Sequence, residues 1–318
     1  MKKKKLIIAA LLLLFVAWWQ PFNIGRTEVT ISENMNAREI ARVLAERGIV
    51  RNVDEFLLSL KIMGREKQLK SGTYELYRYK SPFYVIGNLS SGGRSEIVVT
   101  IPEGSTMYET AQILANHGLV DSSRFINLCQ SEEMISESGV GGSSLEGYLF
   151  PDTYSLSSLQ SEESIIAMML KNFRKRTAGF HGGDGDSLHR VVILASIVER
   201  EAKYEDERPI IARVFVNRLK AKRPLESCAT IFYIKKTTGT NIPSHKLTDR
   251  DLMIDSPFNT YVHLGLPPGP ICSPGESSIR AAMTPADVDF LYFVAKGDGR
   301  HHFSRTYREH AAAKDRYQ

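Results

Sequence analysis

The sequence has few cysteines, and most of the chain has almost no net charge. Its three cysteines, Cys129, Cys228 and Cys272, cannot form a disulfide framework, although one disulfide stays open, and no C-x-x-C zinc signature occurs. The lysines at positions 2–5 supply four of the 41 basic residues, which leaves 37 against 36 acidic residues in the rest of the chain. Without a basic field, we expect no nucleic-acid partner.

The motifs of two common hydrolase classes are also missing. The chain has no G-x-S-x-G turn for a serine nucleophile and no H-E-x-x-H helix for zinc. A zinc hydrolase would have to use His301, His302 and His310, and adjacent histidines seldom both reach one ion. The composition therefore favours neither a metal site nor a serine nucleophile.

The apolar run that stands out is Leu6–Trp19, which follows the four lysines. Fourteen helical residues span only about 21 Å, short of a ~30 Å hydrocarbon core. Extension through Ile24, with lysines and tryptophans in the two interfaces, brings the length close to adequate. A cleaved signal peptide is the alternative, but no small-x-small site follows. We expect residues 1–24 to be a single-pass anchor in the cytoplasmic membrane, with the body outside the cytoplasm.

An internal repeat follows the predicted anchor. Val29–Val50 aligns with Val99–Val120 at a constant offset of 70 residues, with 10 of 22 positions identical. Each copy predicts a strand and then a helix that starts with an N-cap-x-x-Glu box and ends before a glycine. These positions are Asn36, Glu39 and Gly48 in the first copy and Thr106, Glu109 and Gly118 in the second.

A second helix and a second strand complete each predicted copy. The helices are expected near residues 54–61 and 122–130, and the strands at 71–77 and 145–154. This strand–helix–helix–strand order is LysM-like, with copy one at residues 28–92 and copy two, with a central motif, at 97–180. Glycan binding and structural scaffolding both stay open for the repeat.

The predicted strand Leu145–Tyr154 reads L-E-G-Y-L-F-P-D-T-Y. It concentrates carboxylate and aromatic side chains, Glu146 and Tyr148 among them, which suit the hydroxyls and faces of sugar rings. A half-buried edge strand would show the same alternation. The glycine-rich segment His181–Asp186 then predicts a linker into a last domain, residues 187–318.

The last domain opens with a predicted helix, Asp186–Lys203, that is apolar almost all round as far as Val198. Glu199 follows at the edge of the apolar stripe, and Glu201 falls near the opposite edge. A carboxyl group in an apolar wall favours its protonated form and can donate a proton to a leaving oxygen. The alternative is that Glu199 is simply the first solvated residue of a core helix.

A second helix is predicted for Glu205–Ala221, and a final apolar strand for Phe290–Ala295. Between them the chain is rich in proline and glycine, which hold loops in fixed, extended shapes. Long ordered loops beside a buried helix more often form a site than filler.

Several long motifs in this domain resemble one family. They are, in order, I-V-E-R-E, R-V-F-V-N-R-L, S-P-F-N-T-Y, G-L-P-P-G-P-I, F-L-Y-F-V-A and H-H-F-S-R-T-Y-R-E-H. With the central motif, they resemble the YceG-like endolytic murein transglycosylases over nearly the whole chain. The resemblance implies an α+β protein with an anchor, a LysM-like module and a catalytic domain that cuts peptidoglycan strands. It places Glu199 at the catalytic glutamate.

The resemblance also implies a set of substrate-binding residues on these motifs: Glu146, Tyr148, Glu226, Asn259, Tyr261, His301 and Ser304. One segment departs from the family pattern. Leu225–Ile231 reads L-E-S-C-A-T-I, with Glu226 in place of a common glutamine and Cys228 in place of an aspartate. The departure puts these loop contacts in doubt and does not touch Glu199.

The implied chemistry needs one acid/base group, whereas glycoside hydrolysis normally uses two carboxylates. The single acid protonates the glycosidic oxygen, and the 6-hydroxyl of N-acetylmuramic acid then closes on C1 to give a 1,6-anhydro end. No metal or organic cofactor is needed. The implied partners are glycan strands, the membrane and a peptidoglycan synthase such as a penicillin-binding protein, beside which the enzyme would end nascent strands. A non-catalytic peptidoglycan-binding scaffold is the alternative.

Overall fold

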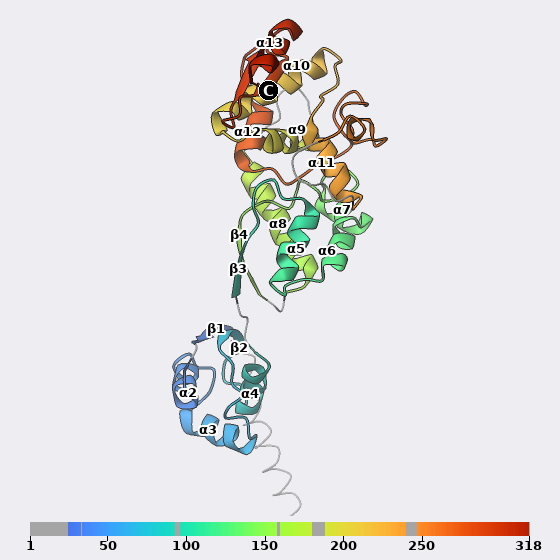
Figure 1. Cartoon of the computed structure of the whole chain (residues 1–318). Helices are drawn as coiled ribbons and strands as arrows, with labels where there is room; N and C mark the ends of the chain where they lie inside the picture. The colour runs from blue at the N-terminus through green and yellow to red at the C-terminus, as the bar shows by residue number, and fades with distance from the viewer. Residues whose placement is uncertain are drawn as a thin grey trace, which may run out of the picture. The chain divides into compact units, whose positions relative to one another are not determined.

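A computed structural model describes residues 25–32, 34–92, 96–157, 160–179, 188–239 and 247–317 (Figure 1). The chain divides into two compact units. The N-terminal unit takes Met1–Ile97 with Ser155–Leu159, and the C-terminal unit takes Val98–Tyr154 with Gln160–Gln318. Helices predominate, and the strands of the described residues pair into three two-stranded sheets. The predicted α+β class is confirmed.

The N-terminal unit has the order strand–helix–helix–strand followed by one more helix. Its elements are β1 (Arg26–Ile31), α2 (Ala37–Glu46), α3 (Val53–Ile62), β2 (Gly72–Tyr77) and α4 (Pro82–Ser91). Strands β1 and β2 pair antiparallel, with Val29 opposite Tyr74. The LysM-like character of this unit, and with it glycan binding, stays a prediction.

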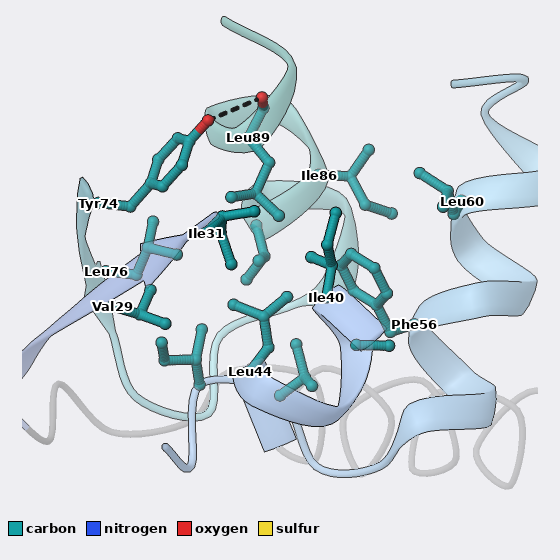
Figure 2. Packing of buried hydrophobic residues seen from close by; sticks show 14 residues of the cluster. Val29, Ile31, Ile40, Leu44, Phe56, Leu60, Tyr74, Leu76, Ile86 and Leu89 are labelled. Carbon is teal, nitrogen blue, oxygen red and sulfur yellow. Dashed lines mark hydrogen bonds between the residues drawn. The ribbon is translucent and has the colours of Figure 1, made fainter. Parts of the chain in front are cut away.

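One apolar core holds the N-terminal unit together (Figure 2). Ile40 and Leu44 of α2 pack with Phe56 of α3, because apolar residues three and four apart lie on one face of a helix. The Tyr74 hydroxyl donates to the Leu89 carbonyl at 3.2 Å, which ties α4 to the sheet. Helix α2 begins with the predicted capping box, in which Asn36 and Glu39 each accept from the other's backbone N–H.

The second copy of the repeat opens the C-terminal unit with an extra helix. Its elements are β3 (Glu96–Thr100), α5 (Met107–Asn116), α6 (Ser122–Cys129), α7 (Glu132–Ser138) and β4 (Thr153–Ser157), followed by α8 (Glu162–Thr177). The capping box of Thr106 and Glu109 is present, and Gly118 has a φ of 69°. The predicted caps of both copies are therefore confirmed.

The prediction of a strand over residues 145–154 is wrong. Strand β4 begins only at Thr153, and residues 146–148 form a turn. Gly147 has a φ of 87°, in the left-handed region, and a Cβ built there would lie 2.5 Å from Pro270. The glycine lets the backbone turn and approach the Pro270 loop, so the alternation of aromatic residues here does not reflect a strand.

The rest of the C-terminal unit is mostly helical. Its elements are α9 (Leu188–Glu201), η2 (Glu205–Glu207), α10 (Arg208–Lys220), α11 (Cys228–Thr237), η3 (Asp251–Met253), α12 (Glu276–Met283), β5 (Tyr292–Ala295), β6 (His301–Ser304) and α13 (Tyr307–Tyr317). Helix α9 packs against α10 and α12, and every residue from Val191 to Val198 is buried. The predicted core helix is confirmed. The helix predicted from Glu205 starts as a 3-10 turn and becomes α-helical at Arg208.

Two sequence predictions lie on residues that the structure does not describe. These are the membrane anchor at residues 1–24 and the linker His181–Asp186. Among the residues that are described, no helix combines the length and the apolar character needed to cross a bilayer. The three cysteines are all free thiols, with Cys129 and Cys272 buried and Cys228 exposed.

Candidate active site

A cavity of about 550 Å³ lies in the C-terminal unit. Its walls come from the end of α9, the start of α11, strand β5, the start of β6 and helix α13. Titratable and polar side chains line it together with apolar ones, and those used below are Glu201, Arg218, Glu226, Cys228, Tyr261, Tyr292, His301, His310 and Lys314. We refer to it as the α9–α13 cavity.

Glu201 is the carboxylate of α9 that reaches this cavity. It is the last residue of the helix, and its Oε1 accepts a 2.5 Å hydrogen bond from the Ser227 hydroxyl. The Ala229 N–H, in the first turn of α11, also donates to it. The residue is half-buried, but its carboxyl group is enclosed, and this burial raises its pKa. The Ser227 hydrogen bond, the charge of His301 and the Ala229 N–H oppose that rise.

His301 is held in the same cavity by a second carboxylate. Its Nδ1 lies 2.8 Å from Oε2 of Glu207, and its backbone N–H donates to Oε1 of Glu207 at 3.1 Å. Glu207 is 5% exposed, so this contact is shielded from water. A carboxylate on Nδ1 fixes the ring orientation and leaves Nε2 as the nitrogen open to a ligand.

Glu226 and Tyr261, two of the expected substrate-binding residues, also line the cavity. Glu226 accepts from Arg218 Nη1 at 2.8 Å, and the Tyr261 hydroxyl lies 3.0 Å from the Cys228 sulfur. Both residues therefore lie where a ligand in the cavity would meet them, and Cys228 stands beside Tyr261 in place of the commoner aspartate.

Asn259, another expected substrate-binding residue, is held inside the protein by its own hydrogen bonds. It is fully buried, and its Nδ2 donates to the carbonyls of Leu252 and Ile254 at 3.0 and 2.8 Å. Its Oδ1 accepts from the Tyr261 N–H at 2.9 Å. Asn259 therefore holds the loop that presents Tyr261 and does not itself line the cavity.

Three other predicted substrate-binding residues are in the core. Glu146 is 1% exposed, its carboxylate accepts from the Met107 N–H at 3.0 and 3.2 Å, and burial raises its pKa to about 8. Tyr148 is 1% exposed, with its hydroxyl 2.6 Å from Nδ1 of His189. Ser304 is 2% exposed. None of the three lines the α9–α13 cavity. Their contact with the substrate stays a prediction, and in this structure each of the three packs inside the protein.

Glu199, the glutamate that the resemblance marks as catalytic, does not line this cavity. Its side chain is 6% exposed, with Oε1 3.0 Å from Arg208 Nη2 and Oε2 accepting from the Gly275 N–H at 2.9 Å. Both carboxylate oxygens are thus engaged by donors from α10 and from the start of α12.

The helical pattern of the sequence places Glu201 near the opposite edge of α9 and gives no sign that its side chain reaches a cavity. A helical projection sorts positions around an axis, but the last residue of a helix can direct its side chain past the end of that axis. The sequence feature that could have indicated Glu201 is its position at the end of the helix, directly before polar loops.

A metal site does not emerge from the candidate histidines. In the described part of the chain, no three His, Cys, Asp or Glu side chains converge as metal ligands would. His301 is bound instead to Glu207. The cavity instead offers an enclosed carboxyl group, an oriented histidine and an arginine, a combination suited to proton transfer on a polar ligand.

Comparison with known proteins assigns the chain to a family. The model of the YceG-like family matches residues 29–316, and the chain belongs to this family. An endolytic murein transglycosylase of Bacillus subtilis (strain 168) is 31% identical over 308 residues, which cover 91% of this chain and 84% of that protein. One of Streptococcus pneumoniae (strain D39) is 30% identical over 312 residues, which cover 89% of this chain and 56% of that protein.

A solved structure shares the fold. The crystal structure of a YceG-like protein from Listeria monocytogenes superposes with a TM-score of 0.59 at 28% identity. The match covers 91% of this chain and 98% of that one.

Proposed function

We propose that the chain is a peptidoglycan lytic transglycosylase that cuts within glycan strands, and that Glu201 is its proton-transfer residue. Relatives named as endolytic murein transglycosylases, matched over most of this chain, support the activity. The observation that supports Glu201 as this residue is its enclosed carboxyl group, which lines the α9–α13 cavity and has a raised pKa.

The reaction follows from a single carboxyl group. Protonated Glu201 donates its proton to the oxygen between N-acetylmuramic acid and N-acetylglucosamine, and the bond from C1 to that oxygen breaks. The resulting carboxylate accepts the proton of the muramic acid 6-hydroxyl as that oxygen bonds to C1. The products are a 1,6-anhydro end and a free 4-hydroxyl, and Glu201 is protonated again.

The neighbours of Glu201 suit both halves of this cycle. Burial raises the pKa of the carboxyl group and so favours the protonated form that the first step needs. The Ser227 hydroxyl and the Ala229 N–H stabilise the carboxylate that the first step leaves behind. His301, oriented by Glu207, presents a ring nitrogen to polar groups of the bound sugar.

The resemblance marks Glu199 as the catalytic glutamate, and this role stays a prediction. Its ion pair with Arg208 and its bond from Gly275 favour a structural role. In this role it clamps the last turn of α9 to α10 and α12, and so holds Glu201 in place.

The setting of the reaction is also part of the proposal. The basic and apolar pattern of residues 1–24 supports a single-pass anchor in the cytoplasmic membrane, with the body on its outer side. Such an enzyme would end nascent strands beside a peptidoglycan synthase. The strand–helix–helix–strand unit at residues 26–77 would add a LysM-like contact to the glycan.

The test is mass spectrometry of muropeptides released from purified peptidoglycan by the full chain. We expect 1,6-anhydro ends from the wild type and a loss of roughly 10²–10⁴-fold with Glu201→Gln, which keeps the shape but cannot give a proton. Reducing ends alone would contradict the lyase mechanism. No cleavage by the folded wild type would favour the scaffold alternative.

A further inference from the structure

Part of the wall of the α9–α13 cavity is formed by basic side chains. Arg218, His310 and Lys314, which we call the basic wall, gather around Tyr292. The Arg218 guanidinium lies 5.2 Å from the centre of the Tyr292 ring, and the His310 ring stacks on Tyr292 at 5.1 Å. Lys314 follows His310 by one turn of α13, so the two side chains share a face of the helix.

The basic wall has donors that the protein leaves unused. Arg218 donates through Nε and Nη1, to Glu226 and to the carbonyls of Pro224, Leu225 and Leu291. Its Nη2, and the Lys314 ammonium, have no acceptor among the residues that the structure describes. Nδ1 of His310 is buried and likewise lacks a partner there. Arg218 Nη2 and the exposed Lys314 ammonium are thus free to donate to a ligand in the cavity that accepts hydrogen bonds.

The charges of the wall do not balance. Arg218 and Lys314 are cations, and among the residues that the structure describes the carboxylate paired with them is Glu226, at 2.8 Å from Arg218 with its side chain 48% exposed. The field is visible in the His310 pKa, which is lowered by burial and then by the charges of Lys314 and Arg218, against a smaller effect of Glu226. The wall therefore attracts anions even with Glu226 in place.

Glu226 sits on this wall in a backbone conformation unusual for its type. Its φ is 53°, in the left-handed region, which is unfavourable for a residue other than glycine. The hydrogen bond from its N–H to the Thr260 carbonyl, at 3.0 Å, holds it there. The carboxylate on Arg218 thus occupies the position that an anionic ligand would take.

We propose that the basic wall is a subsite for a carboxylate of the substrate, and that Glu226 occupies it until that carboxylate displaces it. The inference rests on the proposed function, because the ligand is then a peptidoglycan strand. Every second sugar of such a strand carries a lactyl ether. It ends either in a peptide stem with free carboxylates or, once the stem is removed, in the lactyl carboxylate itself. Arginine suits such a group, since its planar fork matches a carboxylate.

This assignment predicts opposite effects for two substitutions. Lys314→Gln removes a cation from the wall and should raise KM on anionic strands. Glu226→Gln removes the competing carboxylate and should lower it. Each change should be about two- to five-fold, the range of partly exposed charge contacts. Arg308→Gln is the matched control, because Arg308 is an exposed cation on the same helix that does not line the cavity.

The experiment uses the full chain and three strand preparations. These are strands with stems, strands stripped by an amidase, and stripped strands whose carboxyls are converted to amides. The opposite changes of KM in Lys314→Gln and Glu226→Gln should appear on strands with stems, on stripped strands or on both. The preparation on which they appear identifies the source of the carboxylate. Both changes should vanish on the strands whose carboxyls are amides. Equal changes of KM on all three preparations, or no change with either substitution, would overturn the subsite.

Binding of the same strands to Glu201→Gln protein separates this result from the proposed function. If the wild type cleaves nothing, the proposed function fails. Even then, the subsite can be tested by adding Lys314→Gln or Glu226→Gln to the Glu201→Gln protein. The subsite predicts that the first substitution weakens binding of anionic strands and that the second strengthens it.

Discussion

The carboxylates of Glu199 and Glu201 lie two residues apart at the end of α9 and face different surroundings. Glu199 pairs with Arg208 at 3.0 Å in a contact that is almost closed to solvent. Glu201 lines the α9–α13 cavity and accepts from the Ser227 hydroxyl at 2.5 Å. The Glu199 carboxylate therefore holds helices together, whereas the Glu201 carboxyl group lines a cavity that a ligand can enter.

Glu199→Gln should destabilise the fold more than it slows the chemistry. The substitution leaves the buried Arg208 guanidinium without its anion, and breaking one side of a buried pair costs about 3–5 kcal/mol. The lower end applies, since the amide oxygen still accepts a bond and the carboxylates of Glu103 and Glu205 lie 3.9 and 3.8 Å from Arg208. The free energy of unfolding in urea measures this loss.

Glu276→Gln is the control for this prediction, because the pair of Glu276 with Arg280 is exposed and should contribute less than about 1 kcal/mol. A Glu199→Gln protein as stable as wild type that released no anhydro-muropeptides would return the catalytic role to Glu199.

The local features of the fold could be predicted from the sequence. The apolar run of α9 and the capping boxes at Asn36 and Thr106 depend on residues within four positions of each other. Such patterns determine local backbone structure with little help from the rest of the chain.

The site depends on contacts that no local pattern contains. Ser227 reaches Glu201 across 26 positions, and Glu207 reaches His301 across 94. The turn at Gly147 is likewise set by its approach to Pro270, far along the chain. A projection of α9 alone gives the angles of Glu199 and Glu201 but not what lies beside each.

Ser227→Ala should move the alkaline limb of the pH–rate profile to higher pH. The hydroxyl donates to the Glu201 carboxylate and so lowers its pKa, against the rise that burial causes. Without the donor the pKa rises further, and the acid form needed for the first step persists to higher pH. The measurement is kcat/KM against pH, which reports the free enzyme. Ser277→Ala, which removes a hydroxyl bonded to the exposed Glu205, should leave the profile in place. If the alkaline limb of Ser227→Ala did not move, or moved to lower pH, the assignment of Glu201 as the acid would be contradicted.

Glu207→Gln should lower kcat by up to about 100-fold through the position of His301, with a smaller effect on KM. Glu207 accepts from both the ring and the backbone of His301, so its loss releases the imidazole from its fixed orientation. The decisive measurement is a double-mutant cycle with His301→Gln. If Glu207 acts through His301, Glu207→Gln should cost little more in the His301→Gln background. Additive losses would show that Glu207 acts on the fold instead.

The stability of the C-terminal unit should fall as pH rises through neutrality because of Glu146. Burial raises the folded pKa of this carboxyl to about 8, whereas an unfolded glutamate titrates near ~4.3. Between these values the folded state binds more protons, so the free energy of unfolding decreases with pH. The contribution of Glu146 is complete below the unfolded value and is lost as pH passes about 8.

Glu146→Gln removes this ionisation and should flatten the dependence, whatever it does to the absolute stability. The measurement is the free energy of unfolding in urea at several values from about pH 5 to 9, and the quantity compared is the slope. Glu133→Gln, at an exposed carboxylate of α7, should keep the wild-type slope. Equal slopes for wild type and Glu146→Gln would mean that the buried carboxyl ionises in the fold as readily as in the unfolded chain. In that case the bonds from Met107 and Tyr233 would offset its burial in full.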